Sequence, residues 1–215
     1  MEDAVPTTRL ARILSMDRCL VACLLGTFVL RCAAAAMGVM IQFYFEFIDK
    51  NIYRISNTEG GLVIAAFFAA ELIGAPIFGA WSDRHGRKLF IIFGPLFGAV
   101  AVQITAMTTV IWILIFTRLL EGLSTASNAP ATLGYISAAT SHSASLRGRV
   151  VGFFEIATVG GMAVGLWLGG RMWDLWGSPA TFGFIHLTSP AFAVDGLIYL
   201  LSLLILGIGL RETHG

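Results

Sequence analysis

Four ionisable side chains lie inside long apolar stretches of the sequence, where they could bind or transfer a proton. They are Arg31, Glu71, Arg118 and Glu121. A charge at the centre of a membrane-spanning helix costs about 2.5 to 3.5 kcal/mol on insertion scales, so each is a candidate functional residue. Arg118 and Glu121 are three positions apart, which places them on one face of a helix.

Two interpretations of these charges remain open. In the first, Arg118 keeps Glu121 or Glu71 ionised until a proton or a substrate competes, and this changes the conformation of the protein. In the second, Arg118 with Glu121, and Arg31 with Glu71 across neighbouring helices, only neutralise each other so that the helices can insert.

The composition predicts that these residues belong to a membrane protein. Of the 215 residues, 57% are hydrophobic and 13% are charged, whereas soluble domains have about 25% charged residues. The mean hydropathy is +0.81. Because 14 basic residues are balanced by 13 acidic ones, no strong field attracts nucleic acid. The lipid bilayer is therefore the expected partner, and nucleic acid is not.

The sequence contains no residue pattern that indicates a metal site, a cofactor site or an enzyme active site. The four histidines are far apart, and Cys19, Cys23 and Cys32 all lie in the first apolar stretch, a pattern without metal-ligand spacing. Phosphate-binding loops and the common hydrolase motifs are absent from the sequence. We predict no cofactor, no metal and no enzymatic activity.

Six apolar stretches are long enough to cross a bilayer, which takes about 20 residues in a helix. The expected spans are 19–41, 61–80, 89–107, 110–139, 150–170 and 190–210. They predict one all-α, integral membrane domain over residues 1–215. Counted at about 1.5 Å per residue, Arg31 and Arg118 lie roughly 18 Å from one membrane edge, and Glu71 and Glu121 roughly 13 Å. The four charges thus share a layer near the midplane.

The distribution of Lys and Arg predicts the orientation, since basic connections stay in the cytoplasm. One set of connections and ends carries nine basic residues: Arg9, Arg12, Arg18, Arg84, Arg87, Lys88, Arg147, Arg149 and Arg211. The opposite set carries three: Lys50, Arg54 and Arg171. We expect both termini in the cytoplasm and the protein in the plasma (inner) membrane.

A charged motif joins the second and third spans. Its defining residues are Gly79, Asp83, Arg84, Gly86, Arg87 and Lys88. This spacing resembles the G-x-x-x-D-R-x-G-R-[RK] signature that the major facilitator superfamily has between helices 2 and 3. The resemblance implies that the motif is a cytoplasmic gate, and that Asp83 contacts a helix of a second half of the transporter.

Further elements extend the resemblance. The segment Arg118–Gly122 is similar to the R-x-x-Q-G element of helix 4, with Glu121 in place of glutamine. Residues 165–170 resemble the helix 5 element G-P-x-x-G-G, with Leu166 in place of proline. The implied fold is the N-terminal six-helix half of the family, built from two inverted three-helix repeats. The second half is not present in residues 1–215, and the resemblance places the midplane charges at a central cavity.

Other residues receive structural expectations. The acid that the family commonly has near the cytoplasmic end of helix 4 is missing, so Glu155 is the candidate partner of Arg87. Asp195 is expected at the membrane interface, near the outer end of the last span. Small residues recurring on the fifth span should let helices pack closely: Gly161, Gly165, Gly169 and Gly170. An aromatic belt is expected at the outer ends of the first and fifth spans, formed by Phe43, Tyr44, Phe45, Phe47, Trp173 and Trp176.

The resemblance implies a half-length transporter that moves a small-molecule substrate by alternating access. Under the first interpretation of the midplane charges, this transport is coupled to protons. A second six-helix half would come from another copy of the chain or from another subunit. The alternatives are a truncated or split-gene product, or a membrane scaffold or sensor, that has no transport activity of its own.

Overall fold

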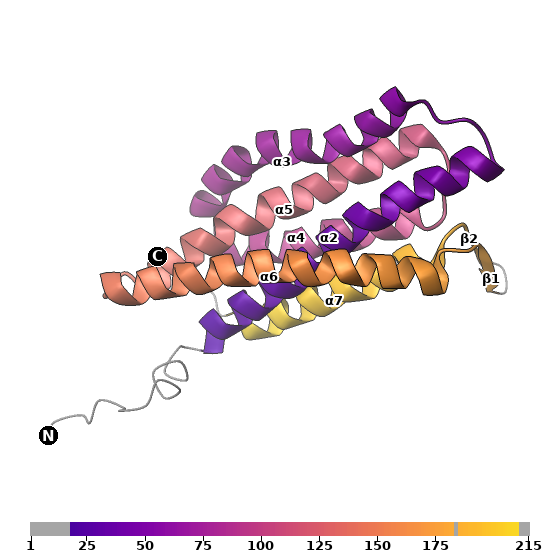
Figure 1. Cartoon of the computed structure of the whole chain (residues 1–215). Coiled ribbons are helices and arrows are strands. Elements are labelled where there is room, and N and C mark those ends of the chain that lie inside the picture. Colours follow the sequence, from indigo (N-terminus) through magenta and orange to yellow (C-terminus); the bar gives the residue numbers. More distant parts are fainter. Residues whose placement is uncertain (1–17, 183–184, 211–215) are drawn as a thin grey trace, which may run out of the picture.

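The computed structural model describes residues 18–182 and 185–210, which form a long helical bundle with one small hairpin (Figure 1). The elements are α2 (Arg18–Asn51), α3 (Asn57–His85), α4 (Arg87–Thr105), α5 (Ile111–Ala139), α6 (Ala144–Trp176), β1 (Ala180–Phe182), β2 (Ile185–Leu187) and α7 (Pro190–Gly209). We call the end where α3 meets α4 the Gly86 end, and the end where α4 meets α5 the Thr108 end.

Five of the six described helices are long and apolar enough to cross a membrane, and α5 is the exception. Its middle third is polar, yet these side chains are buried: Thr117, Arg118, Glu121, Ser124, Thr125, Ser127 and Asn128. A helix that turns its polar side chains to other helices does not need an apolar surface all round. The expected multi-pass helical membrane fold is confirmed at this level.

The helices pack in the order α3, α5, α4, α7, α2, α6, each chiefly against its neighbours in this order. As a result, α3 and α6 have only one main packing partner each, α5 and α2 respectively. The apolar windows of α3 and α6 are 22% and 28% buried, against 50% for α2 and α4. Long stretches of α3 and α6 are therefore open to lipid or to another protein.

Two apolar clusters occupy the two ends of the bundle. Tyr44 and Phe192 belong to the cluster at the Thr108 end, and Tyr135 and Phe154 to the one at the Gly86 end. The polar part of α5 lies between them. Side chains there form hydrogen bonds between helices: Asn128 Nδ2 donates to the Ile91 carbonyl at 3.1 Å. Inside a bilayer such bonds hold helices together, because no water competes for the polar groups.

Three of the described helices, α2, α3 and α6, extend beyond the predicted spans. The first was expected to end at residue 41 and continues to Asn51, and the fifth covers Ala144–Trp176 instead of 150–170. Hydropathy marks only the part of a helix that crosses lipid. The extensions are set by other signals: Lys50 pairs with Glu46 one turn earlier, and Ser143 caps the first turn of α6.

A two-stranded antiparallel hairpin between α6 and α7 departs from the all-α prediction. It pairs Ala180 with Leu187 and Thr181 with His186. The residue that follows β2, Thr188, is fixed to the end of α4, because its backbone N–H donates to the Ala106 carbonyl at 2.8 Å. The Tyr44 hydroxyl hydrogen-bonds to Thr188 Oγ1 as well, at 2.7 Å. The hairpin is thus anchored to the Thr108 end of the bundle.

Candidate functional site

An ion pair within α5 lies inside the bundle. Arg118 Nη1 donates to Glu121 Oε2, and the two side chains are 5% and 0% exposed. The other oxygen, Glu121 Oε1, accepts a hydrogen bond from the Tyr199 hydroxyl of α7 at 3.3 Å. The Arg118 guanidinium also lies 4.9 Å from the centre of the Phe67 ring of α3, a cation–π contact. This pair therefore connects three helices.

Asp195 of α7 lies in the same buried region. It is 0% exposed, and neither carboxyl oxygen has a hydrogen-bond partner among the described residues. The sequence placed it near the outer end of the last span, at the membrane interface, and the structure buries its side chain among the helices. The Asp195 side chain therefore lies below the surface, within electrostatic range of Arg118 and Glu121.

The second ion pair joins α2 to α3. Arg31 Nη1 lies 3.6 Å from Glu71 Oε1, and the side chains are 17% and 31% exposed. The predicted proximity of these residues across two helices is thus observed. Because the side chains remain partly open, this pair borders an accessible face of the bundle, whereas the α5 pair is enclosed.

The Gly79–Lys88 motif is almost entirely helical. α3 continues to His85, and only Gly86, with φ of 97°, interrupts the helices before α4 begins at Arg87. This left-handed backbone region strongly favours glycine. Arg87 pairs with Asp83 inside the motif, with Nη2 2.8 Å from Oδ1. Arg84 and Asp83 are exposed on the turn.

Glu155 was expected to pair with Arg87, but Arg87 pairs with Asp83 in the structure. Asp83, four residues before Arg87, provides the carboxylate. The Arg87 side chain lies along α5, where a Cβ added to Gly134 would be 2.8 Å from its Nε. Glu155 is exposed on α6, a helix that packs chiefly against α2. Arg87, the first residue of α4, therefore pairs with a carboxylate from the last turn of α3.

The glycine repeat on α6 forms a close contact with α2. An added Cβ would lie 2.4 Å from the Phe28 carbonyl oxygen at Gly161, 2.2 Å from that of Cys32 at Gly165, and 2.5 Å from that of Ala36 at Gly169. Gly170 is different, since an added Cβ would meet nothing within 4 Å. Three of the four predicted packing glycines therefore lie at the interface, because a period of four keeps them on one helix face.

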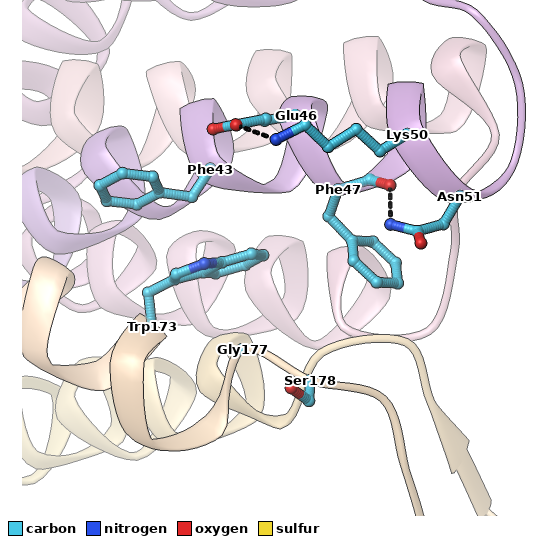
Figure 2. A pocket seen from close by; sticks show the side chains of 8 residues that line it. All are labelled: Phe43, Glu46, Phe47, Lys50, Asn51, Trp173, Gly177 and Ser178. Carbon is cyan, nitrogen blue, oxygen red and sulfur yellow. Dashed lines mark hydrogen bonds and ion pairs between the residues drawn. The ribbon is translucent and has the colours of Figure 1, made fainter.

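A pocket of about 330 Å³ opens between α2 and α6 at the Thr108 end. Figure 2 shows its lining: Phe43, Glu46, Phe47, Lys50, Asn51, Trp173, Gly177 and Ser178. The Phe43 and Trp173 rings stack with centres 6.0 Å apart, while Glu46 is already paired with Lys50. Tyr44, expected in an aromatic belt, is instead fully buried.

The described cysteines and histidines do not gather at one place. Cys19, Cys23 and Cys32 are free thiols. Within residues 18–182 and 185–210, no group of three or more His, Cys, Asp or Glu side chains could hold a metal ion. The charged residues of the bundle interior are thus the chemically significant groups in this part of the chain.

Comparison with known proteins identifies the family. Residues 20–214 match the Major Facilitator Superfamily. The chain belongs to this superfamily of membrane transporters. The match covers nearly the whole chain, so the charged motif at Gly86 and the buried charges of α5 lie in a facilitator-type bundle.

Relatives within the superfamily include several transport proteins. The chain is 32% identical over 138 residues to multidrug resistance protein 2 of Bacillus subtilis, covering 64% of this chain and 34% of the relative. It is 31% identical over 182 residues to the class E tetracycline resistance protein of Escherichia coli, covering 84% and 42%. The arabinose-proton symporter of Bacillus subtilis is 25% identical over 141 residues, covering 63% and 30%. The chain thus aligns with less than half of each relative.

Three residues of the buried site were not assigned to it from the sequence. Tyr199 and Asp195 are four positions apart in the last span, and this spacing could have indicated a polar face on α7. Phe67 gave no signal, because a phenylalanine in an apolar span is expected to face lipid or core. Its contact with Arg118 depends on how α3 crosses α5.

Proposed function

We propose that this chain is one half of a proton-coupled facilitator transporter, which moves a small solute by alternating access. The observation that carries the proposal is the Arg118–Glu121 pair, enclosed within the bundle and held by three helices. A scaffold or sensor gains nothing from the insertion cost of such charges. A transporter needs charged groups that respond to protons or substrate.

The two ion pairs have different roles in this proposal. Arg31 and Glu71 are partly open and line the solute path, where their charges can contact the solute. Arg118 and Glu121 are closed off and respond to protonation. A pair that changes charge biases the equilibrium between two conformations by its differential interaction with each of them. The membrane potential adds about 2.3 kcal/mol per charge per 100 mV.

The solute is proposed to be a small organic molecule. Tetracycline, several drugs and arabinose are the molecules that the names of the relatives mention, and one name specifies a proton symporter. These proteins are at most 32% identical to the chain and align over less than half of their own length.

The Gly79–Lys88 turn is proposed to be the cytoplasmic gate. Its basic residues favour the cytoplasmic side, which would also place both termini there and the protein in the plasma membrane. Asp83 remains 61% exposed in its side chain although it pairs with Arg87. It can therefore contact a second six-helix bundle, from another copy of this chain or from another subunit, against the open sides of α3 and α6.

The internal arrangement is proposed to be two inverted three-helix repeats. Exchanging the first three helices with the last three relates α2 to α5, α3 to α6 and α4 to α7. The packing of α3 on α5 then corresponds to that of α6 on α2, and both are extensive. The packing of α4 on α5 corresponds to that of α7 on α2. This equivalence supports the repeat arrangement.

Uptake by reconstituted vesicles tests the function. The purified chain is placed in lipid vesicles, and radiolabelled tetracycline or arabinose uptake is measured with and without an imposed pH gradient. We expect uptake driven by the gradient, and its loss in Glu121→Gln. Glu46→Gln, which changes an exposed pair on α2, is the matched control. Unchanged gradient-driven uptake in Glu121→Gln would refute coupling through this pair.

The oligomeric state is measured on the same preparation. Light scattering in detergent gives the protein mass without the detergent contribution. A mass of two bundles is expected for the active species. If a preparation in which two bundles associate shows no uptake, the result would favour a truncated product, a scaffold or a sensor without transport activity.

A further inference from the structure

Two polar groups of the buried charge cluster have no hydrogen-bond partner among the described residues, and they are chemically complementary. Within residues 18–182 and 185–210, no donor reaches either carboxyl oxygen of Asp195, and no acceptor reaches the Nε–H of Arg118. Asp195 is 0% and Arg118 4% exposed, so water at the surface does not satisfy them. Buried polar groups are rarely left unpaired, and each such group requires an explanation.

Charge counting shows that the cluster holds one acid too many. Arg118 provides one positive charge, and it already pairs with Glu121. Both Glu121 oxygens accept hydrogen bonds, one from Arg118 and one from Tyr199, which suits a carboxylate. With Asp195 ionised as well, the cluster would carry a net negative charge inside the bundle, and such burial is costly.

The other described residues near Asp195 supply no second positive charge. From α2, the thiol of Cys32 is in electrostatic range, and from α7, Tyr199 is the next titratable residue on the same face. From α4, Gln103 donates its amide N–H to the Ala193 carbonyl. The charged residues of α6 at this end, Arg171 and Asp174, are exposed.

We propose that Asp195 is the residue that carries the exchangeable proton of this transporter, and that its release lets Asp195 compete with Glu121 for Arg118. This inference rests on the proposed proton-coupled transport. In this inference Asp195, rather than Glu121, binds the proton. The hydrogen bonds of Arg118 then depend on whether Asp195 is protonated, and this couples the proton to the packing of α5 and α7.

The step is a simple proton transfer. The O–H bond of the Asp195 carboxylic acid breaks, and the proton leaves to water on the side toward which the transporter is open. The Asp195 carboxylate then accepts a hydrogen bond from the free Nε–H of Arg118. The Arg118 contact with Glu121 weakens in return, and reprotonation of Asp195 from the other side restores it.

Tyr199 packs closely against α4, and this packing holds its hydroxyl beside Glu121. A Cβ added to Gly98 of α4 would lie 2.1 Å from the Tyr199 ring, so the absence of a side chain at Gly98 is what admits the ring. The Tyr199 hydroxyl can then retain Glu121 while Arg118 turns toward Asp195. Glu121 keeps a donor in both arrangements, which lowers the cost of opening the pair.

Infrared spectroscopy tests the proton site without reference to any solute. The chain is reconstituted in vesicles near neutral pH, and the carbonyl band of protonated carboxylic acids is recorded. Incorporation of aspartate labelled with carbon-13 at the side-chain carboxyl shifts the band of an aspartic acid and leaves that of a glutamic acid in place. We expect a band that shifts with this label, and its loss on strong alkalisation. Absence of a label-sensitive band would overturn the proposal.

Variants assign the band to a residue. Asp195→Asn should remove it, and Glu121→Gln should leave it. The asparagine has the same shape and replaces a side chain without hydrogen bonds, so the variant should fold, as checked by its elution from a sizing column. If it does not fold, the labelled unmodified protein still decides whether an aspartic acid is protonated. A band that persists in folded Asp195→Asn would overturn the assignment.

A transport measurement separates this inference from the proposed function. With tetracycline as probe, Asp195→Asn should retain exchange between labelled and unlabelled solute, while uptake driven by a pH gradient falls to the level of protein-free vesicles. Gradient-driven uptake equal to that of the unmodified chain would overturn the inference. If the unmodified chain transports nothing but its aspartic acid band is present, the proposed function and the coupling role of Asp195 both fail, and only the protonation of Asp195 stands.

Discussion

The two ion pairs of the bundle have the same composition, one arginine and one glutamate, yet opposite environments. Arg118 and Glu121 are one turn apart on α5, nearly or fully buried, and held by Tyr199 and Phe67. Arg31 and Glu71 come from different helices, stand 3.6 Å apart and remain partly exposed. The enclosed pair is held by contacts from three helices, while the open pair can separate with little rearrangement.

The difference follows from solvation. Removing one partner of a buried ion pair leaves an uncompensated charge and typically costs about 3 to 5 kcal/mol, whereas an exposed pair contributes about 0 to 1 kcal/mol. A residue that must contact a solute and then release it belongs to the second class. A residue that must convert a change in charge into a change in shape belongs to the first.

The largest expected effect is that of Arg118→Ala. It leaves Glu121 and Asp195 together in the bundle without a positive charge, and the stability should fall by about 3 to 5 kcal/mol. Thermal unfolding of the protein in detergent measures the loss. The double variant Arg118→Ala/Glu121→Ala should recover part of it, since it also removes one carboxylate. A loss below about 1 kcal/mol in the single variant would show that the pair is solvated.

A smaller effect is expected where α6 packs against α2 beside the open pair. In Gly161→Ala the new Cβ would lie 2.4 Å from the Phe28 carbonyl oxygen and 3.1 Å from Arg31 Cβ. The helices must move apart, at a cost of about 1 to 3 kcal/mol. Gly170→Ala is the matched control, since its Cβ meets nothing within 4 Å. Equal melting temperatures of the two variants would contradict the close contact.

The smallest change in stability is expected for Glu71→Gln. The side chain is 31% exposed, so removing its charge should change the free energy of unfolding by less than about 1 kcal/mol. Its effect should instead fall on solute uptake, measured as a change in the solute concentration that gives half-maximal rate. Glu46→Gln should alter neither quantity. A stability loss as large as that of Arg118→Ala would show that both pairs are structural.

The sequence predicted the membrane class, the family and the Arg118–Glu121 pair, because each depends on local composition, on a local motif or on spacing along one helix. The α6 glycines, four apart, also predicted a close contact. Such patterns can be interpreted without knowledge of the tertiary structure, since the period of a helix determines which residues share a face.

Features that depend on how helices cross could not be predicted in this way. Asp195 was expected at the membrane interface from its distance to the end of a span, and the structure buries its side chain among the helices. Glu155 was expected to pair with Arg87, and Asp83 is the carboxylate that pairs with Arg87 in the structure. Both expectations came from position along a span, which does not determine which side chains meet between helices.

The turn at Gly86 has a mechanical consequence. A single non-helical residue joins the 29 residues of α3 to the 19 residues of α4. A one-residue connection allows rotation about its backbone dihedral angles but is too short to allow translation. We therefore expect that α3 can rotate relative to α4, whereas a shift of α3 along its own axis would also shift α4. Asp83 and Arg87 form an ion pair across this connection. Because the pair is partly exposed and contributes only about 0 to 1 kcal/mol, it adds little resistance to rotation of α3 about Gly86.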